Sequence, residues 1–168
     1  MRTVEENKEL IAKYPFLQFE PDYYEYTWAD EVPDGWQIAF GDEMWAELKQ
    51  ILEEENLLDE FQFYGIKEKY GTLRFEYTPF SDRLEKWETK YDLKSMLYCI
   101  NCGKPTKYFT RGWINFICED CKNERPDRKT EELTWECIPS YSSYDSDGTE
   151  HKTVSQFQEQ FEAQWKKI

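Results

Sequence analysis

Apolar residues recur every three to four positions between residues 43 and 55. They are Met44, Trp45, Leu48, Ile51 and Leu52. This spacing puts them along one side of an α-helix. Asp42 precedes the run, and Asp side chains cap helix N-termini well. The pattern predicts a helix over 43–55, capped by Asp42, with this side in the core.

A different period follows along the chain. Residues 61–69 and 72–78 are separated by Tyr70 and Gly71, and in the second run apolar residues alternate with Arg74 and Glu76. Alternation with a period of two around a short Gly-containing turn is typical of two antiparallel strands. The sequence therefore predicts a β-hairpin.

Other segments have weaker patterns. Residues 4–13 resemble a short helix, and a second helix over 82–96 begins at Ser81 or Asp82. Alternation over 131–142 predicts a strand, followed by the turn sequence SSYDSDGTE. A final helix is expected over about 154–167, with Ser155 and Gln158 as a capping box and these residues on its apolar side: Val154, Phe157, Phe161, Trp165 and Ile168.

Four of the five cysteines form two Cys-x-x-Cys pairs separated by fifteen residues: Cys99, Cys102, Cys118 and Cys121. This spacing is typical of a zinc site in a reducing compartment rather than of a disulfide framework. Gly103 suits the tight turn after the first pair. Residues 108–110 and 113–117 can pair as strands around Arg111 and Gly112, which completes a zinc ribbon.

Four thiolates complete the tetrahedral coordination of zinc and leave no position for water. We therefore expect one structural Zn²⁺ ion rather than a catalytic one. Two alternatives remain open. One is a redox-active Cys-x-x-Cys pair, although no βαβ pattern surrounds it. The other is an iron–sulfur cluster.

The composition is acidic and aromatic. The formal net charge of the 168 residues is −14, and 18% of them are aromatic. Residues 1–97 carry 11 basic against 23 acidic side chains, whereas residues 98–130 carry 7 basic against 4 acidic. An acidic chain repels phosphate backbones, so nucleic-acid binding by the whole protein is disfavoured.

Candidate catalytic groups are few. His151 is the one histidine and lies in a polar turn sequence, and Cys137 lies in an apolar strand pattern typical of a buried residue. The acidic runs fit solvated helix surfaces better than acid–base machinery. No Gly-rich phosphate-binding motif is present. We expect no enzymatic activity.

The ribbon combines basic and aromatic side chains that could contact nucleic acid or another partner: Lys104, Lys107, Arg111, Trp113 and Arg125. The alternative is that these residues keep the ribbon soluble and pair with the acidic body of the same chain. The large negative charge favours this second interpretation.

The sequence also bears on location. The N-terminal segment has no continuous apolar region of the signal-peptide type, and no apolar run approaches the roughly 20 residues needed to cross a bilayer. We expect a cytoplasmic protein without membrane contact.

Three motifs together resemble a family of small phage and prophage proteins of unassigned function. They are DGWQIAFGDEMWAELKQILEE, FQFYGIKEKYGTLRFEY and CINCGKPTKYFTRGWINFICEDC, and they cover about residues 35–122. The acidic stretch 20–34 and the extension 123–168 are not covered. The resemblance implies a viral or mobile-element origin and action in a bacterial cytoplasm, and it supplies no catalytic residues.

The predicted fold is α+β, with an antiparallel hairpin packed by helices and an appended four-cysteine zinc ribbon. We divide the chain into an acidic body (1–97), the ribbon (98–122) and a C-terminal strand and helix that pack back on the body (123–168). The predicted function is zinc-stabilised binding of a host protein, as in host takeover or anti-defence. The alternative is a nucleic-acid-binding ribbon that acts in transcription or replication.

Overall fold

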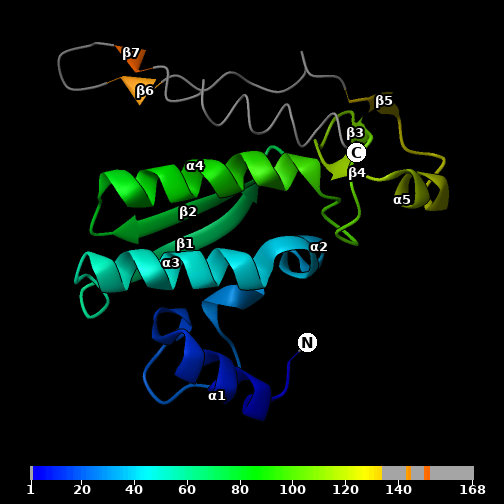
Figure 1. Cartoon of the computed structure of the whole chain (residues 1–168). Helices are drawn as coiled ribbons and strands as arrows, with labels where there is room; N and C mark the ends of the chain where they lie inside the picture. Colours follow the sequence, from blue (N-terminus) through cyan, green and yellow to red (C-terminus); the bar gives the residue numbers. More distant parts are fainter. Residues whose placement is uncertain (1, 134–142, 145–149, 152–168) are drawn as a thin grey trace.

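A computed structural model describes residues 2–133, 143–144 and 150–151. Its fold is α+β, as predicted. A two-stranded antiparallel sheet lies in the body, a small three-stranded sheet lies in the ribbon, and helices pack around the first sheet (Figure 1). The chain begins with helix α1 (Val4–Lys13), which Thr3 and Glu6 cap reciprocally. The short 3₁₀ turns η1 (Pro15–Leu17) and η2 (Trp28–Glu31) follow.

The long helix of the body begins earlier than predicted. Helix α2 (Asp34–Trp36) continues through the π-helical turn η3 (Gln37–Gly41) into α3 (Asp42–Glu54), which carries the predicted apolar side. Asp42 has helical backbone angles, so its predicted role as the N-terminal cap is wrong. The helix extends back to Asp34 because Trp36 and Phe40 are also buried against the core.

The hairpin is confirmed. Strands β1 (Gln62–Lys69) and β2 (Thr72–Thr78) pair antiparallel, with a bulge between Phe63 and Gly65. Tyr70 and Gly71 both have positive φ, at 55° and 81°, which is the two-residue turn that matches the twist of a hairpin. The sheet buries one face against the helices: Phe63, Ile66, Leu73, Phe75 and Tyr77.

Helix α4 (Asp82–Leu97) packs on β2 and on α3 (Figure 1). Its predicted start is confirmed, because the Ser81 hydroxyl accepts a hydrogen bond from the Leu84 amide. Trp87 is 1% exposed, and its Nε1 donates to the Met44 carbonyl at 3.1 Å. The buried Ser95 hydroxyl accepts from the Leu73 amide of β2. Side chains of helix α4 therefore form hydrogen bonds with the backbone of both α3 and β2.

The acidic stretch 20–34 is tied to the body through Arg2. Its guanidinium forms a salt bridge with Asp30 at 2.6 Å and donates to Gln37 at 2.7 Å, at the start of the long helix. Trp28 of the same stretch packs against Phe63 of β1. This region, which the resemblance left out, thus covers part of the sheet.

The ribbon sheet has the strand order β4-β3-β5. Strands β3 (Tyr108–Thr110) and β4 (Phe116–Ile117) form the predicted hairpin, although the second strand is shorter than the predicted 113–117. Helix α5 (Glu119–Glu124) follows. Strand β5 (Thr130–Glu132) pairs with β3, at the start of the predicted strand 131–142.

Two further short strands, β6 (Ser143–Tyr144) and β7 (Glu150–His151), pair with each other. His151, predicted in a turn, therefore lies in a strand. The remainder of the predicted strand, including Cys137, and the predicted helix 154–167 lie outside the described residues.

Candidate metal centre

The fold brings the four predicted cysteines together: the Sγ atoms of Cys99, Cys102, Cys118 and Cys121 all lie within 4.8 Å of one another. The Cys102 Sγ atom is 3.6 Å from the Sγ atoms of both Cys118 and Cys121. A tetrahedral ion with metal–sulfur bonds of about 2.3 Å separates its ligands by roughly 3.8 Å. The cluster therefore has the spacing that a four-thiolate metal site requires.

Local backbone geometry forms each half of the site. In the first turn, the Cys99 amide donates to the Lys104 carbonyl at 2.7 Å, and the Gly103 amide donates to the Cys99 carbonyl at 2.9 Å. Gly103 has a φ of 74°, a conformation that favours glycine, as the sequence predicted. In the second half, Cys118 is the N-terminal cap residue of α5, and its sulfur faces the Cys121 amide at 3.5 Å.

The cluster is shielded from solvent. Cys99, Cys118 and Cys121 are buried, and Cys102 is half-buried. Burial, followed by hydrogen bonding to the neighbouring thiols of Cys102, Cys99 and Cys118, raises the pKa of the Cys121 thiol. Metal binding therefore competes with protonation of this thiol.

The turn that carries Cys99 and Cys102, residues 99–104, is called the metal-binding turn below. It is packed against the body at Gly35. The Gly35 amide donates to the Ile100 carbonyl at 3.1 Å, and the Trp36 indole donates to the Tyr98 carbonyl at 3.0 Å. A Cβ atom at Gly35 would collide with the Cys99 carbonyl and lie 2.5 Å from the Ile100 oxygen. The metal-binding turn and the start of the long helix therefore meet through backbone atoms.

The second glycine of this contact lies on the ribbon side. A Cβ atom at Gly103 would lie 2.6 Å from the Gly35 carbonyl oxygen. The sequence predicted a turn at Gly103, but it did not predict that this turn would meet Gly35. The Gly-Trp pair in the first resembling motif was the available signal, since a glycine in a helix often marks a close approach of backbone.

The basic residues proposed as contact groups form salt bridges close to the metal site. Lys104 pairs with Asp120 at 2.6 Å, and Lys107 pairs with Glu119 at 3.2 Å. Arg111 pairs with Glu131, and Arg125 pairs with Asp127 at 3.6 Å. The hydrogen bond to Asp120 raises the pKa of Lys104.

These carboxylates all come from residues 119–131 and not from the acidic body, so the predicted pairing with the body is wrong. The pairs are exposed and contribute little to stability. The ribbon cations pair with these carboxylates rather than with those of the body because α5 and β5 bring them closer.

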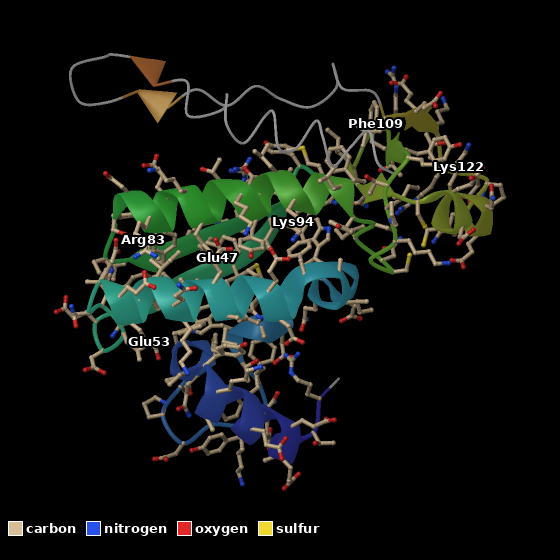
Figure 2. All side chains as sticks on the ribbon, in the orientation of Figure 1. Glu47, Glu53, Arg83, Lys94, Phe109 and Lys122 are labelled. Atoms are coloured by element: carbon tan, nitrogen blue, oxygen red, sulfur yellow. The ribbon has the colours of Figure 1, made fainter. Side chains whose placement is uncertain are left out.

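Two other ribbon side chains, Trp113 and Lys122, are not part of these salt bridges. Trp113, a predicted contact residue, is 74% exposed, on a turn in which the Thr110 hydroxyl donates to the Trp113 carbonyl at 2.5 Å. Lys122, labelled on α5 in Figure 2, places its ammonium group 3.8 Å from the ring centre of Tyr108. This cation–π contact was not predicted, because its residues are 14 positions apart in the sequence.

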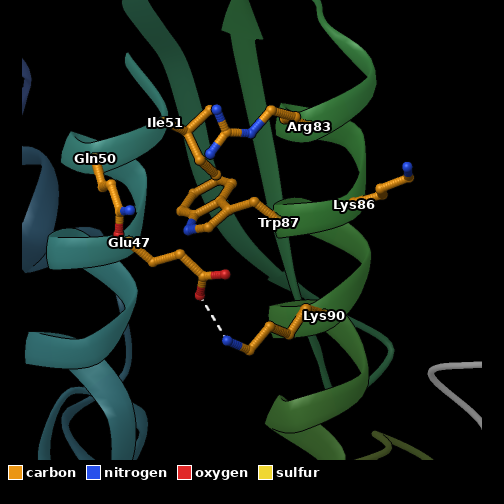
Figure 3. Close-up of a pocket in the computed structure, with 7 residues that line it drawn as sticks. All are labelled: Glu47, Gln50, Ile51, Arg83, Lys86, Trp87 and Lys90. Carbon is orange, nitrogen blue, oxygen red and sulfur yellow. Dashed lines mark hydrogen bonds and ion pairs between the residues drawn. The ribbon is translucent and has the colours of Figure 1, made fainter. Parts of the chain in front are cut away.

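A groove of about 340 Å³ runs between α3 and α4 (Figure 3). Trp87 and Ile51 contribute apolar surface, and the polar lining residues are Glu47, Gln50, Arg83, Lys86 and Lys90. Lys90 pairs with Glu47 at 2.6 Å, and Arg83 pairs with Glu54 at 2.7 Å. The groove thus contains one carboxylate, already bound to a lysine, rather than a pair of carboxylates.

No helix in the described part of the chain combines the length and the apolar character needed to cross a membrane. Comparison with family models, curated proteins and solved structures finds no match to this chain. The resemblance to phage and prophage proteins therefore stays a prediction.

Proposed function

We propose that this protein is a non-enzymatic binding protein, stabilised by one zinc ion, that contacts another protein through its acidic, aromatic surface. The observation that carries this proposal is the distribution of charge. The ribbon's candidate cations are paired with nearby carboxylates, so the net negative charge of the body dominates what an approaching molecule meets.

The choice of zinc rests on the ligand set. Four thiolates at tetrahedral spacing favour zinc over metals that prefer oxygen ligands, and an ion bound by all four would have no open position for catalysis. Native mass spectrometry and elemental analysis of the protein as purified test this directly. We expect one zinc per chain; iron, or no metal in a folded protein, would contradict it.

The binding role rests on exposed apolar side chains. Seven large ones lie at the surface of the described residues: Phe19, Tyr23, Ile38, Tyr64, Tyr70, Phe80 and Trp113. Aromatic residues are enriched at protein interfaces, where they bury much area at a low entropy cost. A basic partner surface complements the charge of the body and accelerates association.

The resemblance gives this proposal its biological setting. We infer that the protein is encoded by a phage or prophage and acts in the bacterial cytoplasm on a host protein, as an inhibitor in host takeover or anti-defence. The test is affinity purification of the tagged full chain from a bacterial host. We expect one stoichiometric partner with a basic surface, released by high salt; failure to retain any host protein would contradict the proposal.

A nucleic-acid-binding ribbon is the second candidate, and one observation favours it. Arg128 and Lys129 form no salt bridge within the described residues, and the Lys129 carbonyl accepts from the Arg111 amide in the turn that carries Trp113. Bases could stack on Trp113 while these cations contact phosphates. A mobility shift that is lost in Arg128→Gln and Lys129→Gln variants would support this function.

A further inference from the structure

We propose that the π-helical turn η3 and the adjoining metal-binding turn form one docking surface, centred on Ile38, for an amphipathic helix of a partner protein that has an apolar face with basic residues along its edges. This inference rests on the proposed protein-binding function and names the surface that performs it. It is carried by the exposure of Ile38, by the backbone contact beneath it and by the charges beside it.

Ile38 is an unusual surface residue. It is 73% exposed, although its neighbours Trp36 and Phe40 are buried in the core at 0% and 2% exposure. It lies within the π-helical turn Gln37–Gly41. Such turns are rare and are frequent at functional sites, because the extra residue changes the direction of a side chain on an otherwise regular helix.

Backbone of the metal-binding turn packs closely against the helix at Ile38. A Cβ atom at Gly103 would lie 3.3 Å from both Ile38 Cγ2 and the Ala39 amide nitrogen, which places the metal-binding turn directly beside Ile38. The Gly35 amide also bonds to the Ile100 carbonyl. An anchor held by two fixed backbone segments loses little entropy when it binds, and this preorganisation favours affinity.

The charges around Ile38 indicate the chemistry of the partner. Asp34 and Asp42 each lie four residues from Ile38 on the same helix, and both are exposed. Neither forms a salt bridge with any residue that the structure describes. Lys13 lies within electrostatic range of Asp42 and offsets part of its charge, so Asp34 contributes more of the negative potential.

The other cations beside this surface do not change its sign, because each is paired with a carboxylate. Lys104, which follows Gly103, pairs with Asp120 at 2.6 Å. Arg2, which bonds to Gln37, pairs with Asp30, and Lys94, which lies over the Phe40 ring, pairs with Glu43. The surface is therefore an apolar centre with acidic neighbours, which complements the apolar face and basic edges of an amphipathic helix. A second copy of the chain is disfavoured as the occupant, because the same acidic groups would face each other.

The test is NMR titration of the labelled, metal-loaded full chain with a short amphipathic helical peptide of leucine and lysine. A peptide with glutamate in place of lysine is the charge control. We expect the lysine peptide to shift the amides of residues 37–41 and 101–104. Ile38→Asp and Ile38→Ala should weaken its binding about tenfold or more, as expected for a central anchor.

Tyr64→Asp is the matched control, because it adds the same charge at a 63% exposed residue of the hairpin. It should leave the affinity within about twofold. The unfolding midpoints of all variants establish that they fold, and Ile38→Ala tests the anchor without adding charge.

Equal binding by wild type and both Ile38 variants, or shifts centred elsewhere on the body, would overturn this inference and leave the proposed function intact. Shifts of residues 37–41 caused by a single-stranded oligonucleotide, or by raising the protein concentration alone, would also overturn it. Failure of the lysine peptide to bind at all would overturn this inference, whereas the proposed function fails only if no host protein is retained in the purification described above.

Discussion

The body and the ribbon differ in the buried groups that stabilise each of them. The body has one large cluster of buried side chains, which includes Trp36, Trp45 and Trp87. In the ribbon, the cluster around the metal site consists of Ile117 and three of the four metal-ligating cysteines. Burial of apolar area stabilises the body, whereas the ribbon has a small buried cluster and four thiols positioned to bind a metal, and such sites couple metal binding to folding. Phe116 of the ribbon also shares a buried cluster with Met96 and Leu97 of α4.

The salt bridges of the two regions also differ. In the body, several pairs join two helices: Glu43 of α3 pairs with Lys90 and Lys94 of α4, and Glu47 pairs with Lys90 (Figure 3). In the ribbon they join residues of the small segment 104–131, and most of these side chains are more than half exposed. The charged pairs therefore help to orient the helices of the body and add little to the ribbon.

The largest predicted difference between the two regions follows from removing a metal ligand. Cys118→Ser deletes one ligand, and structural zinc contributes an apparent binding free energy of about 10–16 kcal/mol to folding in small domains. We expect loss of the bound metal and of amide protection over residues 99–124, while α3 and α4 remain protected. Metal analysis and hydrogen exchange measure the two effects.

Cys137→Ser is the control for this experiment, since it removes the cysteine that the zinc spacing leaves out. It should retain one metal ion per chain. A Cys118→Ser protein that keeps its metal and its protected ribbon would show that the cluster is not a metal site.

The second prediction concerns a substitution that destabilises the body and leaves the metal site of the ribbon intact. Trp87→Ala removes a buried indole that contacts Phe75 at a ring distance of 4.6 Å and Tyr91 at 5.7 Å. Truncation of a buried tryptophan costs about 3–5 kcal/mol. Urea unfolding should show this loss, with the metal still bound before the transition.

Trp113→Ala is the matched control, because this tryptophan is 74% exposed. Its effect on the free energy of unfolding should stay within about 0.5 kcal/mol. Equal losses in the two variants would refute the assignment of stability to the core of the body.

The third prediction concerns the junction between the regions. Gly35→Ala places a methyl group against the Cys99 and Ile100 carbonyls, and we expect a cost of about 1–3 kcal/mol together with weaker metal binding. Gly41→Ala on the same helix is the control. The nearest atom there is 3.7 Å away, so we expect a gain of about 0.4–1 kcal/mol.

Thermal unfolding and a competitive zinc titration measure both quantities. If Gly35→Ala lowered the stability without changing the metal affinity, the two regions would be independent despite their contact. Similar results for both glycines would contradict the close backbone approach.

The smallest predicted effect comes from Glu88 of α4. Burial raises the pKa of Glu88, although the hydrogen bond from Tyr77 acts in the opposite direction. A raised pKa in the folded state means that the contribution of this group to stability is greatest below pH 4.5, the ordinary value, and is lost as the pH rises through the folded-state pKa.

Glu88→Gln should therefore stabilise the protein at pH 7, by no more than about 1 kcal/mol. It should also flatten the dependence of the unfolding midpoint on pH above 4.5. Glu85→Gln, one turn earlier and exposed, should change neither property. An unchanged or lower midpoint for Glu88→Gln would contradict the sign of the pKa shift.

Local sequence patterns predicted the elements of both regions well. Helix α3, the hairpin and the start of α4 follow from periodicity and turn chemistry that involve near neighbours in the chain, and the cysteine spacing located the metal site. The early start of the long helix was missed, because the π-helical turn interrupts the 3.6-residue period between Trp36 and Met44.

The remaining errors involve residues far apart in the sequence. The Gly35–Gly103 contact and the pairing of Lys107 with Glu119 depend on how the ribbon folds back, and no periodic pattern records this. Charge totals by segment misassigned the partners of the ribbon cations, because a total does not indicate which carboxylate lies nearest.

The π-helical turn has one more consequence. A turn of this kind adds one residue to an α-helix, and each residue of an α-helix advances by about 100° around its axis. Deleting a single residue between Trp36 and Gly41 would convert the turn to regular helix, with few hydrogen bonds lost. It would also swing Gly35 away from the Ile100 carbonyl by more than a quarter of a revolution. A one-residue insertion thus sets the angular alignment between the helix and the metal-binding turn.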